Sequence, residues 1–253
     1  MLAKAFTVAF VGAEARLVEV EVRVGAGLPG FKTVGLAAKS VTEADQRIRS
    51  AIEVTGQRWP GQKIIANLAP GALPKEGTHF DLALALCVIA ADGKLESEAL
   101  DKYMIVGELG LDGSVRGIRG TLSAALECAK HGYVGIICPE QNAAEAALVK
   151  GIEIVPVGSL AHCLAWMNGK RDPSPIPPPS RRTAEVSHDL DEVRGHQTAK
   201  RAMEIAAAGG HNLLTIGFDT PVYCPGCLQR ARPFQMQRRS IAVSHRTTGQ
   251  RWE

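Results

Sequence analysis

The stretch Lys75–Asp81 places an amine, an imidazole and a carboxylate in one short segment, with the hydroxyl of Thr78 among them. A hydroxyl acts as a nucleophile when a neighbouring amine or imidazole accepts its proton. Because the sequence shows no nucleophile and no metal partner for His79, we favour a simpler interpretation, in which His79 and Asp81 form a hydrogen-bonded surface pair. Asp81 also stands where a helix is expected to begin, and a capping or first-turn acid is a sufficient explanation for it.

Three cations lie beside glycine-rich turns, namely Lys75, Arg116 and Arg119. Two interpretations stay open for them. In one, they line a surface that binds anions or the phosphates of DNA. In the other, which the sequence favours, they are solvated turn charges without a ligand.

The sequence after Gly217 lacks a phosphate-binding loop. A loop of the Walker A type needs G-x-x-x-x-G-K-[ST], because its backbone amides cradle phosphates, its Lys reaches the terminal ones and its hydroxyl holds Mg²⁺. Here Val222 and Tyr223 stand in place of the second Gly and the Lys, and Cys224 in place of the hydroxyl. We therefore predict no cofactor and no ATP hydrolysis for this chain.

Cys224 and Cys227 form a C-x-x-C motif. A zinc site needs four ligands, and only His245 follows as a third, so no metal is expected there. A redox role requires a strand and a helix around the motif, for which the sequence gives little indication. The other four cysteines stand singly in apolar stretches and are predicted to be reduced core thiols: Cys87, Cys128, Cys138 and Cys163.

Composition describes a soluble protein, which we expect in the cytoplasm. The chain has 253 residues, is 45% hydrophobic and carries a net charge of +3. Residues 218–253 hold six arginines and two acids, so the basic character belongs to this tail. The longest apolar run, Leu82–Ala91, is too short to cross a bilayer, and we expect no contact with a membrane.

Apolar periodicity predicts alternating strands and helices, and hence an α/β fold. Residues 25–36, which are rich in glycine, are expected to form turns. The predicted strands are Ala5–Val11, Leu17–Val24, Lys63–Leu68, Tyr103–Glu108, Val134–Cys138 and Ile152–Val155. The predicted helices are Ser40–Thr55, capped by Ser40 and Glu43, Phe80–Ala91, Thr121–Lys130, Glu140–Val149 and Ser159–Asn168.

Residues 169–183, GKRDPSPIPPPSRRT, interrupt this pattern with five prolines flanked by basic residues. Such a segment adopts an extended polyproline conformation. We favour a plain tether, and the alternative is a ligand for a proline-binding domain. After it, a helix with an apolar stripe around Ala199–Ala206 precedes a short strand, Asn212–Ile216.

Several strings together resemble one known family: GLPGFKTVGL, NLAPGALPKEGTHFDLALAL, VGELGLDGSVRGIRG, PEQNAAEAALV and DLDEVRGHQTAKRAMEIAAAGGHNLLTIG. They are similar to the ComM/YifB family of magnesium-chelatase-related AAA+ proteins. The resemblance implies a Lon-protease-like domain in residues 1–168, a linker in 169–183, the first helix and strand of an AAA+ ATPase in 184–217, and a divergent tail in 218–253. It also implies ATP and Mg²⁺ in the intact family, rings of identical subunits, and DNA processing by branch migration in natural transformation.

The proteolytic domain of Lon uses a serine and a lysine, and this chain departs from both. The resemblance puts His79 at the serine position and Leu122 at the lysine position. We therefore expect a non-proteolytic domain, with a Lon-like hydrolase that uses Lys75, His79 and Asp81 as the alternative.

For the ATPase part, the resemblance implies that Val193 and Gly195 border an adenine pocket, where His196 departs from the usual Gln. It implies that Gly217 begins the lost phosphate loop, so that the chain is a truncated or disrupted member. Without phosphate contacts, weak ATP binding is the most that we expect.

Overall fold

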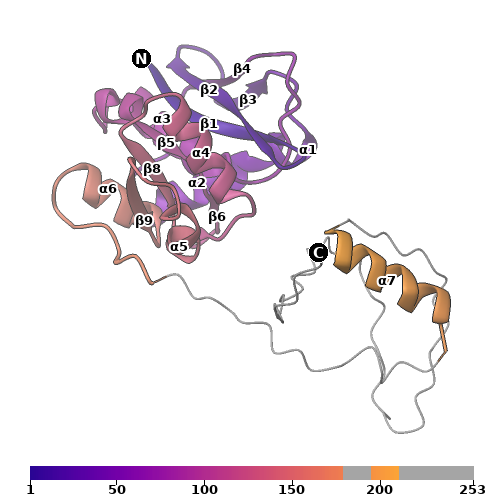
Figure 1. The fold of residues 1–253 in the computed structure, drawn as a ribbon. Helices are drawn as coiled ribbons and strands as arrows, with labels where there is room; N and C mark the ends of the chain where they lie inside the picture. Colours follow the sequence, from indigo (N-terminus) through magenta and orange to yellow (C-terminus); the bar gives the residue numbers. More distant parts are fainter. Residues whose placement is uncertain (179–194, 211–253) are drawn as a thin grey trace, which may run out of the picture. The chain divides into compact units, whose positions relative to one another are not determined.

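The structure is a computed structural model that describes residues 1–178 and 195–210 (Figure 1). The chain divides into two compact units, Met1–Arg181 and Arg182–Glu253. In the second unit, helix α7 (Gln197–Gly209) confirms the predicted helix, while the predicted strand Asn212–Ile216 lies outside the described residues. The remainder of this section concerns the first unit.

A seven-stranded sheet in the order β3-β4-β2-β1-β5-β8-β9 forms the centre of this unit (Figure 1). Neighbouring strands are parallel except at the pairs β4–β2 and β2–β1, so the fold is a mixed α/β architecture, as predicted. The strands are β1 (Leu2–Val11), β2 (Glu14–Gly25), β3 (Gly30–Val34), β4 (Lys63–Ala69), β5 (Tyr103–Ile105), β8 (Gly135–Pro139) and β9 (Glu153–Val157). A separate two-stranded ribbon joins β6 (Glu108–Leu109) to β7 (Val115–Arg116).

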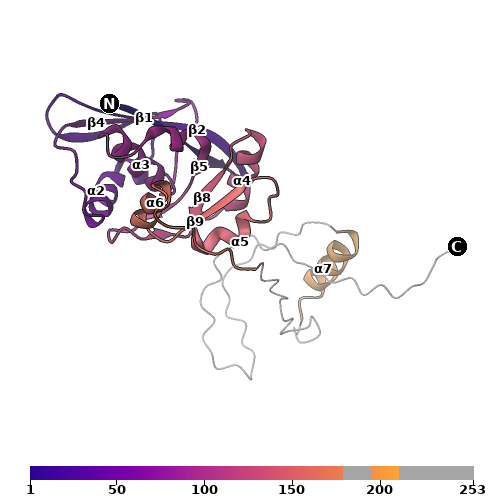
Figure 2. The ribbon, with the colours of Figure 1, turned by 90° about the vertical axis from the view of Figure 1, so that its left-hand side faces the viewer.

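Helices cover both faces of the sheet. In Figure 2, α2 (Ala44–Val54), α3 (Asp81–Ala91) and α6 (Leu160–Met167) lie together below β1, β2 and β4, and their apolar residues share one core with these strands. Helices α4 (Thr121–Lys130) and α5 (Ala143–Ala146) contribute to a second core with residues of β1, β5 and β8. Every residue of α3 is buried, because this helix lies between the sheet and α2.

Several predicted elements are confirmed. Strand β2 buries Val18, Val20, Val22 and Val24 on one face and leaves the polar residues between them partly exposed. Helix α4 has the predicted bounds, α3 begins one residue later than predicted, and Ser159 caps α6 by accepting the backbone N–H of His162 at 3.1 Å. The four cysteines of this unit that were predicted to be core thiols are free and buried. Within the described residues, no helix is long and apolar enough to cross a membrane.

Other boundaries differ from the prediction. Residues 30–34, which were expected to form turns, are strand β3, because all five of them pair in parallel with β4. The single helix expected over Ser40–Thr55 is split into α1 (Lys39–Thr42) and α2, and the hydroxyl of Ser40 accepts the N–H of Gly77 at 3.2 Å instead of capping a helix.

Two more predicted elements divide into shorter ones. The strand expected over Tyr103–Glu108 becomes β5 and β6, in two different sheets. The helix expected over Glu140–Val149 becomes a 3-10 turn, η2 (Glu140–Asn142), followed by the short α5. A second 3-10 turn, η1 (Ser97–Lys102), precedes β5.

Candidate functional site

The loop that connects β4 to α3 carries the residues that were singled out for chemistry, and it holds Lys75 inside the protein. The backbone of Lys75 bonds on both sides to the segment after β3: its N–H donates to Leu36 O at 3.2 Å, and its carbonyl accepts from Ala38 N at 2.9 Å. Its side chain is fully buried and its ammonium donates to Pro70 O. Loss of solvent lowers the pKa of Lys75. Both interpretations of Lys75 as a surface cation are therefore wrong.

His79 is likewise an interior residue, with 6% of its surface exposed. Its Nε2 lies 2.8 Å from Val8 O in β1, and its ring lies 4.8 Å from the ring of Phe10 and 4.1 Å from that of Phe80, between centroids. Burial lowers the pKa of His79, which keeps the imidazole neutral at physiological pH. The expected surface pair of His79 and Asp81 is wrong, because each of the two side chains is buried with a different partner.

Asp81 binds Arg47 of α2. Arg47 Nε donates to Asp81 Oδ2 at 2.7 Å and Nη2 donates to Oδ1 at 3.0 Å. Burial raises the pKa of Asp81 to about 6, although the guanidinium acts in the opposite direction. Asp81 is the first residue of α3, so the prediction of a first-turn acid is confirmed, whereas the cap position itself belongs to Phe80.

The hydroxyl of Thr78 donates to the carboxylate of Glu108 in β6 and not to an amine or imidazole. The same carboxylate lies 3.7 Å from Arg116 Nη1 in β7. Arg116 and Arg119 are both exposed. Exposure fits a role in anion or DNA contact and equally fits solvated turn charges, so both interpretations stay open for these two residues. The structure thus brings Thr78, Glu108 and Arg116 together, whereas Lys75 and His79 bond to other partners.

His79 and Leu122, which the resemblance to Lon puts at the serine and lysine positions, lie in different elements, the loop before α3 and helix α4. Leu122 is in the first turn of α4, and its N–H donates to Glu145 Oε1 at 3.1 Å. A Cβ added at Gly120, the residue that precedes α4, would lie 2.8 Å from the ring of Phe10, which in turn contacts His79. The ring of Phe10 therefore lies close both to His79 and to the residue that precedes α4.

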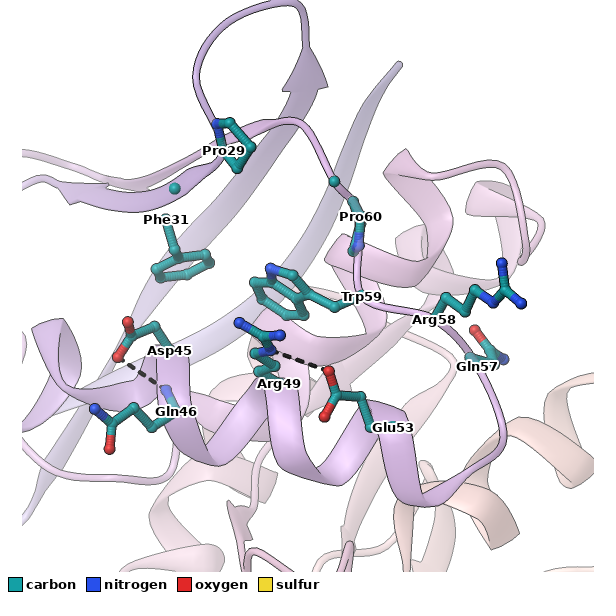
Figure 3. A pocket seen from close by; sticks show the side chains of 12 residues that line it. Pro29, Phe31, Asp45, Gln46, Arg49, Glu53, Gln57, Arg58, Trp59 and Pro60 are labelled. Atoms are coloured by element: carbon teal, nitrogen blue, oxygen red, sulfur yellow. Dashed lines mark hydrogen bonds and ion pairs between the residues drawn. The ribbon is translucent and has the colours of Figure 1, made fainter.

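A pocket with a volume of about 730 Å³ lies between β3, α2 and the loop before β4 (Figure 3). The rings of Phe31 and Trp59 lie side by side in its wall with centroids 6.1 Å apart, and Asp45, Arg49 and Glu53 line it from α2. Sequence reasoning missed this site. The signal that could have indicated it is Trp59, an aromatic residue between Arg58 and Pro60 in a short connection.

The remaining predicted positions belong to the second unit or lie outside the described residues. Gly195 precedes α7 and has a left-handed backbone with φ of 76°. Val193, Gly217, Cys224 and Cys227 lie outside the described residues. In residues 1–178 and 195–210, no three His, Cys, Asp or Glu side chains come together in the manner of a metal site.

Two models of protein families match parts of this chain. Residues 20–142 match the family model of subunit ChlI of Mg-chelatase, and residues 189–221 match that of magnesium chelatase, subunit ChlI. The uncharacterized protein YifB of Escherichia coli is 42% identical over 211 residues, which is 83% of this chain and 42% of YifB. Competence protein ComM of Haemophilus influenzae is 38% identical over 222 residues, which is 85% of this chain and 43% of ComM. The chain belongs to the ComM/YifB family.

This ComM/YifB chain spans less than half the length of the curated relatives that it matches. A more distant similarity extends beyond the family. The DNA repair protein RadA of Synechocystis is 30% identical over 171 residues, which is 65% of this chain and 32% of RadA.

Proposed function

We propose that residues 1–168 act as a non-proteolytic Lon-like domain within a DNA-processing protein of the magnesium-chelatase type. The main support for the proposal is that Lys75, His79 and Asp81, in and just after the loop before α3, are each already engaged in a hydrogen bond or an ion pair. Lys75 bonds Pro70 O, His79 bonds Val8 O, and Asp81 binds Arg47. None of these groups is left to activate a nucleophile, and the ring of Phe10 fills the space beside His79.

The DNA part of the proposal rests on relatives. One is named a competence protein and another a DNA repair protein. In this proposal, residues 184–217 correspond to the start of an AAA+ ATPase whose intact form uses ATP and Mg²⁺, and Val193, Gly195 and Gly217 belong to its nucleotide site. Because the Walker A residues are absent after Gly217, this chain by itself would bind ATP weakly and hydrolyse none.

In this proposal the protein acts in the cytoplasm. One of two of its surfaces would contact DNA. The first is the tail, residues 218–253, with its six arginines. The second is the turn region of Arg116 and Arg119, whose exposed guanidinium groups lie on the folded domain. We favour the tail for two reasons. Arg116 lies near the carboxylate of Glu108, which partly neutralises its charge. The tail carries a net charge of +4 and the whole chain +3, which leaves −1 for residues 1–217.

The test is the salt dependence of DNA binding by the whole chain and by a chain that ends at Gly217. Removal of the tail should make the slope of log K against log salt less negative by several units if its arginines contact phosphates, since each contact contributes about −0.9. Lys75→Met, which changes a buried cation, serves as a control that should leave binding unchanged. Tight, salt-sensitive binding by residues 1–217 that disappears with Arg116→Ala and Arg119→Ala would instead assign DNA contact to the folded domain. Absence of DNA binding in both chains would reject this part of the proposal.

Labelling of the pure protein by a serine or threonine protease probe tests the other part. We expect no label on the chain. Covalent labelling at Thr78 that is lost in His79→Gln would favour a Lon-like hydrolase at Lys75, His79 and Asp81 over the non-proteolytic domain.

A further inference from the structure

The pocket between β3 and α2 has no role in the function proposed above. Its apolar walls are the rings of Phe31 and Trp59, and prolines from two different loops, Pro29 and Pro60, lie at its edges (Figure 3). We propose that this pocket binds a proline-rich segment flanked by arginines, and that the occupant is segment 169–183 of a second copy of this chain.

The first argument is the chemistry of the rings. A polyproline helix has its conformation fixed before binding and carries no internal hydrogen bonds, so it loses little entropy when it docks onto aromatic rings. Phe31 and Trp59 are both partly exposed and tilted by 47° to each other, which leaves ring surface open toward the pocket. Its volume of about 730 Å³ lies within the roughly 300–1,000 Å³ of pockets that hold ligands.

The second argument is charge. The carboxylate of Asp45 accepts the N–H of Gln46 at 2.8 Å and has no basic partner among the described residues, while Glu53 is paired with Arg49 at 3.0 Å. The fourth charged residue of the lining, Arg58, lies beyond Trp59 and points away from Asp45 (Figure 3). The carboxylate of Asp45, on the Phe31 side of the pocket, therefore suits a peptide that carries arginine. The segment provides basic residues before and after its prolines, namely Lys170, Arg171, Arg181 and Arg182.

The third argument identifies a second copy as the source. The N–H of Ser174 donates to Pro156 O in β9 at 3.0 Å, which attaches the start of the segment to one edge of the sheet. The pocket adjoins β3 at the opposite edge of the seven-stranded sheet, about 29 Å away at about 4.8 Å per strand. From Ser174, the proline run Pro175–Pro179 extends only about 16 Å in a polyproline helix, so these prolines cannot reach the pocket of their own chain. The residues that the structure describes in this run are Pro175–Pro178. They are exposed, and so they are available to another molecule.

The test uses a fluorescent peptide with the sequence of residues 169–183, titrated with the 253-residue chain and followed by anisotropy. We expect saturable binding that Asp45→Asn weakens about three- to tenfold. Asp101→Asn, which changes an exposed acid outside the pocket, is the matched control and should leave the affinity unchanged. A peptide whose arginines are replaced by Gln should bind wild type and Asp45→Asn equally, because the two changes remove the same interaction.

A second measurement tests the aromatic contact and the source of the segment. Trp59→Leu, checked for unchanged thermal unfolding, should weaken peptide binding at least tenfold. Replacement of Pro175, Pro177 and Pro178 by Ser should lower self-association of the chain in sedimentation experiments. Undetectable peptide binding, or binding that neither Asp45→Asn nor Trp59→Leu changes, would overturn the proposal. Oligothymidine that binds in a Trp59-dependent manner in place of the peptide would also overturn it, and self-association that persists without the prolines would exclude a second copy as the source.

Discussion

Arg47 and Asp81 join α2 to the start of α3 through two hydrogen bonds, Nε to Oδ2 at 2.7 Å and Nη2 to Oδ1 at 3.0 Å. The carboxylate is almost fully buried, whereas 23% of the Arg47 side chain remains exposed. Arg47 Nη2 also donates to Ser40 O in α1 at 3.0 Å. One guanidinium therefore connects three helices next to the loop that holds Lys75 and His79.

Burial of Asp81 makes stability depend on pH. The pKa of Asp81 is raised from 3.8 to about 6, so the folded state binds a proton more tightly than the unfolded state. The stabilising contribution of this group is complete below about pH 4, and it is lost as the pH rises through about 6. Its upper limit is roughly 3 kcal/mol, because each pKa unit corresponds to about 1.4 kcal/mol.

The measurement is the free energy of unfolding by urea between pH 4 and pH 7, for wild type and for Asp81→Asn. The difference between the two proteins isolates Asp81 from other acids that titrate in this range. Wild type should lose about 2–3 kcal/mol relative to the variant across this interval. A difference that does not change with pH would contradict the prediction.

Lys75→Met should preserve or increase stability at pH 7. Methionine has a similar length and places no ammonium in the interior, and replacement of a buried charge by an apolar group of similar volume is often neutral or stabilising. The lowered pKa of Lys75 means that the stability of wild type rises with pH as this amine loses its proton. Unfolding at pH 7 and pH 9.5 should show this rise in wild type and not in the variant. A loss above about 2 kcal/mol at pH 7 would show that the bond to Pro70 O is needed.

Gly35 allows the close approach of β3 to β4, and Gly35→Ala should be strongly destabilising. Its φ is +105°, and an added Cβ would lie 2.2 Å from Leu68 O. We expect a loss of about 3 kcal/mol or more, because both the backbone conformation and the contact are unfavourable. Gly61→Ala is the matched control, since nothing lies within 4 Å of a Cβ there, and its effect should stay within about 1 kcal/mol. Equal melting temperatures for the two variants would contradict this account.

The sequence predicted those helices and strands whose apolar pattern lies within one continuous stretch of the chain. Helix α3 follows from an uninterrupted apolar run, and α4 from apolar spacing that ends before Gly132. Strand β3 could not be predicted in this way, because the glycines and the proline of residues 25–36 around it indicate turns. Its extended form depends on pairing with β4, about thirty residues later. The split at Glu43 between α1 and α2 likewise has no marker in the apolar pattern.

The site was harder to predict than the fold for a related reason. Lys75 lies in a loop rich in glycine and proline, which indicates exposure, yet its backbone pairs with Leu36 and Ala38 and carries the side chain inward. The pocket of Phe31 and Trp59 combines β3, α2 and a short loop, so no single stretch of sequence contains it. The burial of Lys75 and the pocket both depend on contacts between segments that are distant in the chain.

Trypsin should cut segment 169–183 at Arg181 or Arg182 before it cuts at Arg171. A protease needs several residues around the cleaved bond in an extended, free conformation. The residues after Arg171 are held, since Asp172 O lies 2.9 Å from His162 Nε2 and the hydroxyl of Ser174 donates to Glu140. Cleavage after Gly217, in the tail, should be similarly early, because its composition predicts few buried contacts.

Mass spectrometry of the first fragments tests this order of cleavage. The resistant fragment should end at Arg181 or Arg182, some residues beyond the boundary at 168 that the sequence predicts. Ser174→Ala removes only the hydrogen bond to Glu140 and should speed cleavage after Arg171, whereas Ser123→Ala, which removes a similar side-chain bond to Ala13 O, should not. If cleavage after Arg171 comes first in wild type, the contacts of Asp172 and Ser174 are too weak to hold the start of the segment against β9. In that case the reach of Pro175–Pro178 would no longer be limited by an attachment at Ser174.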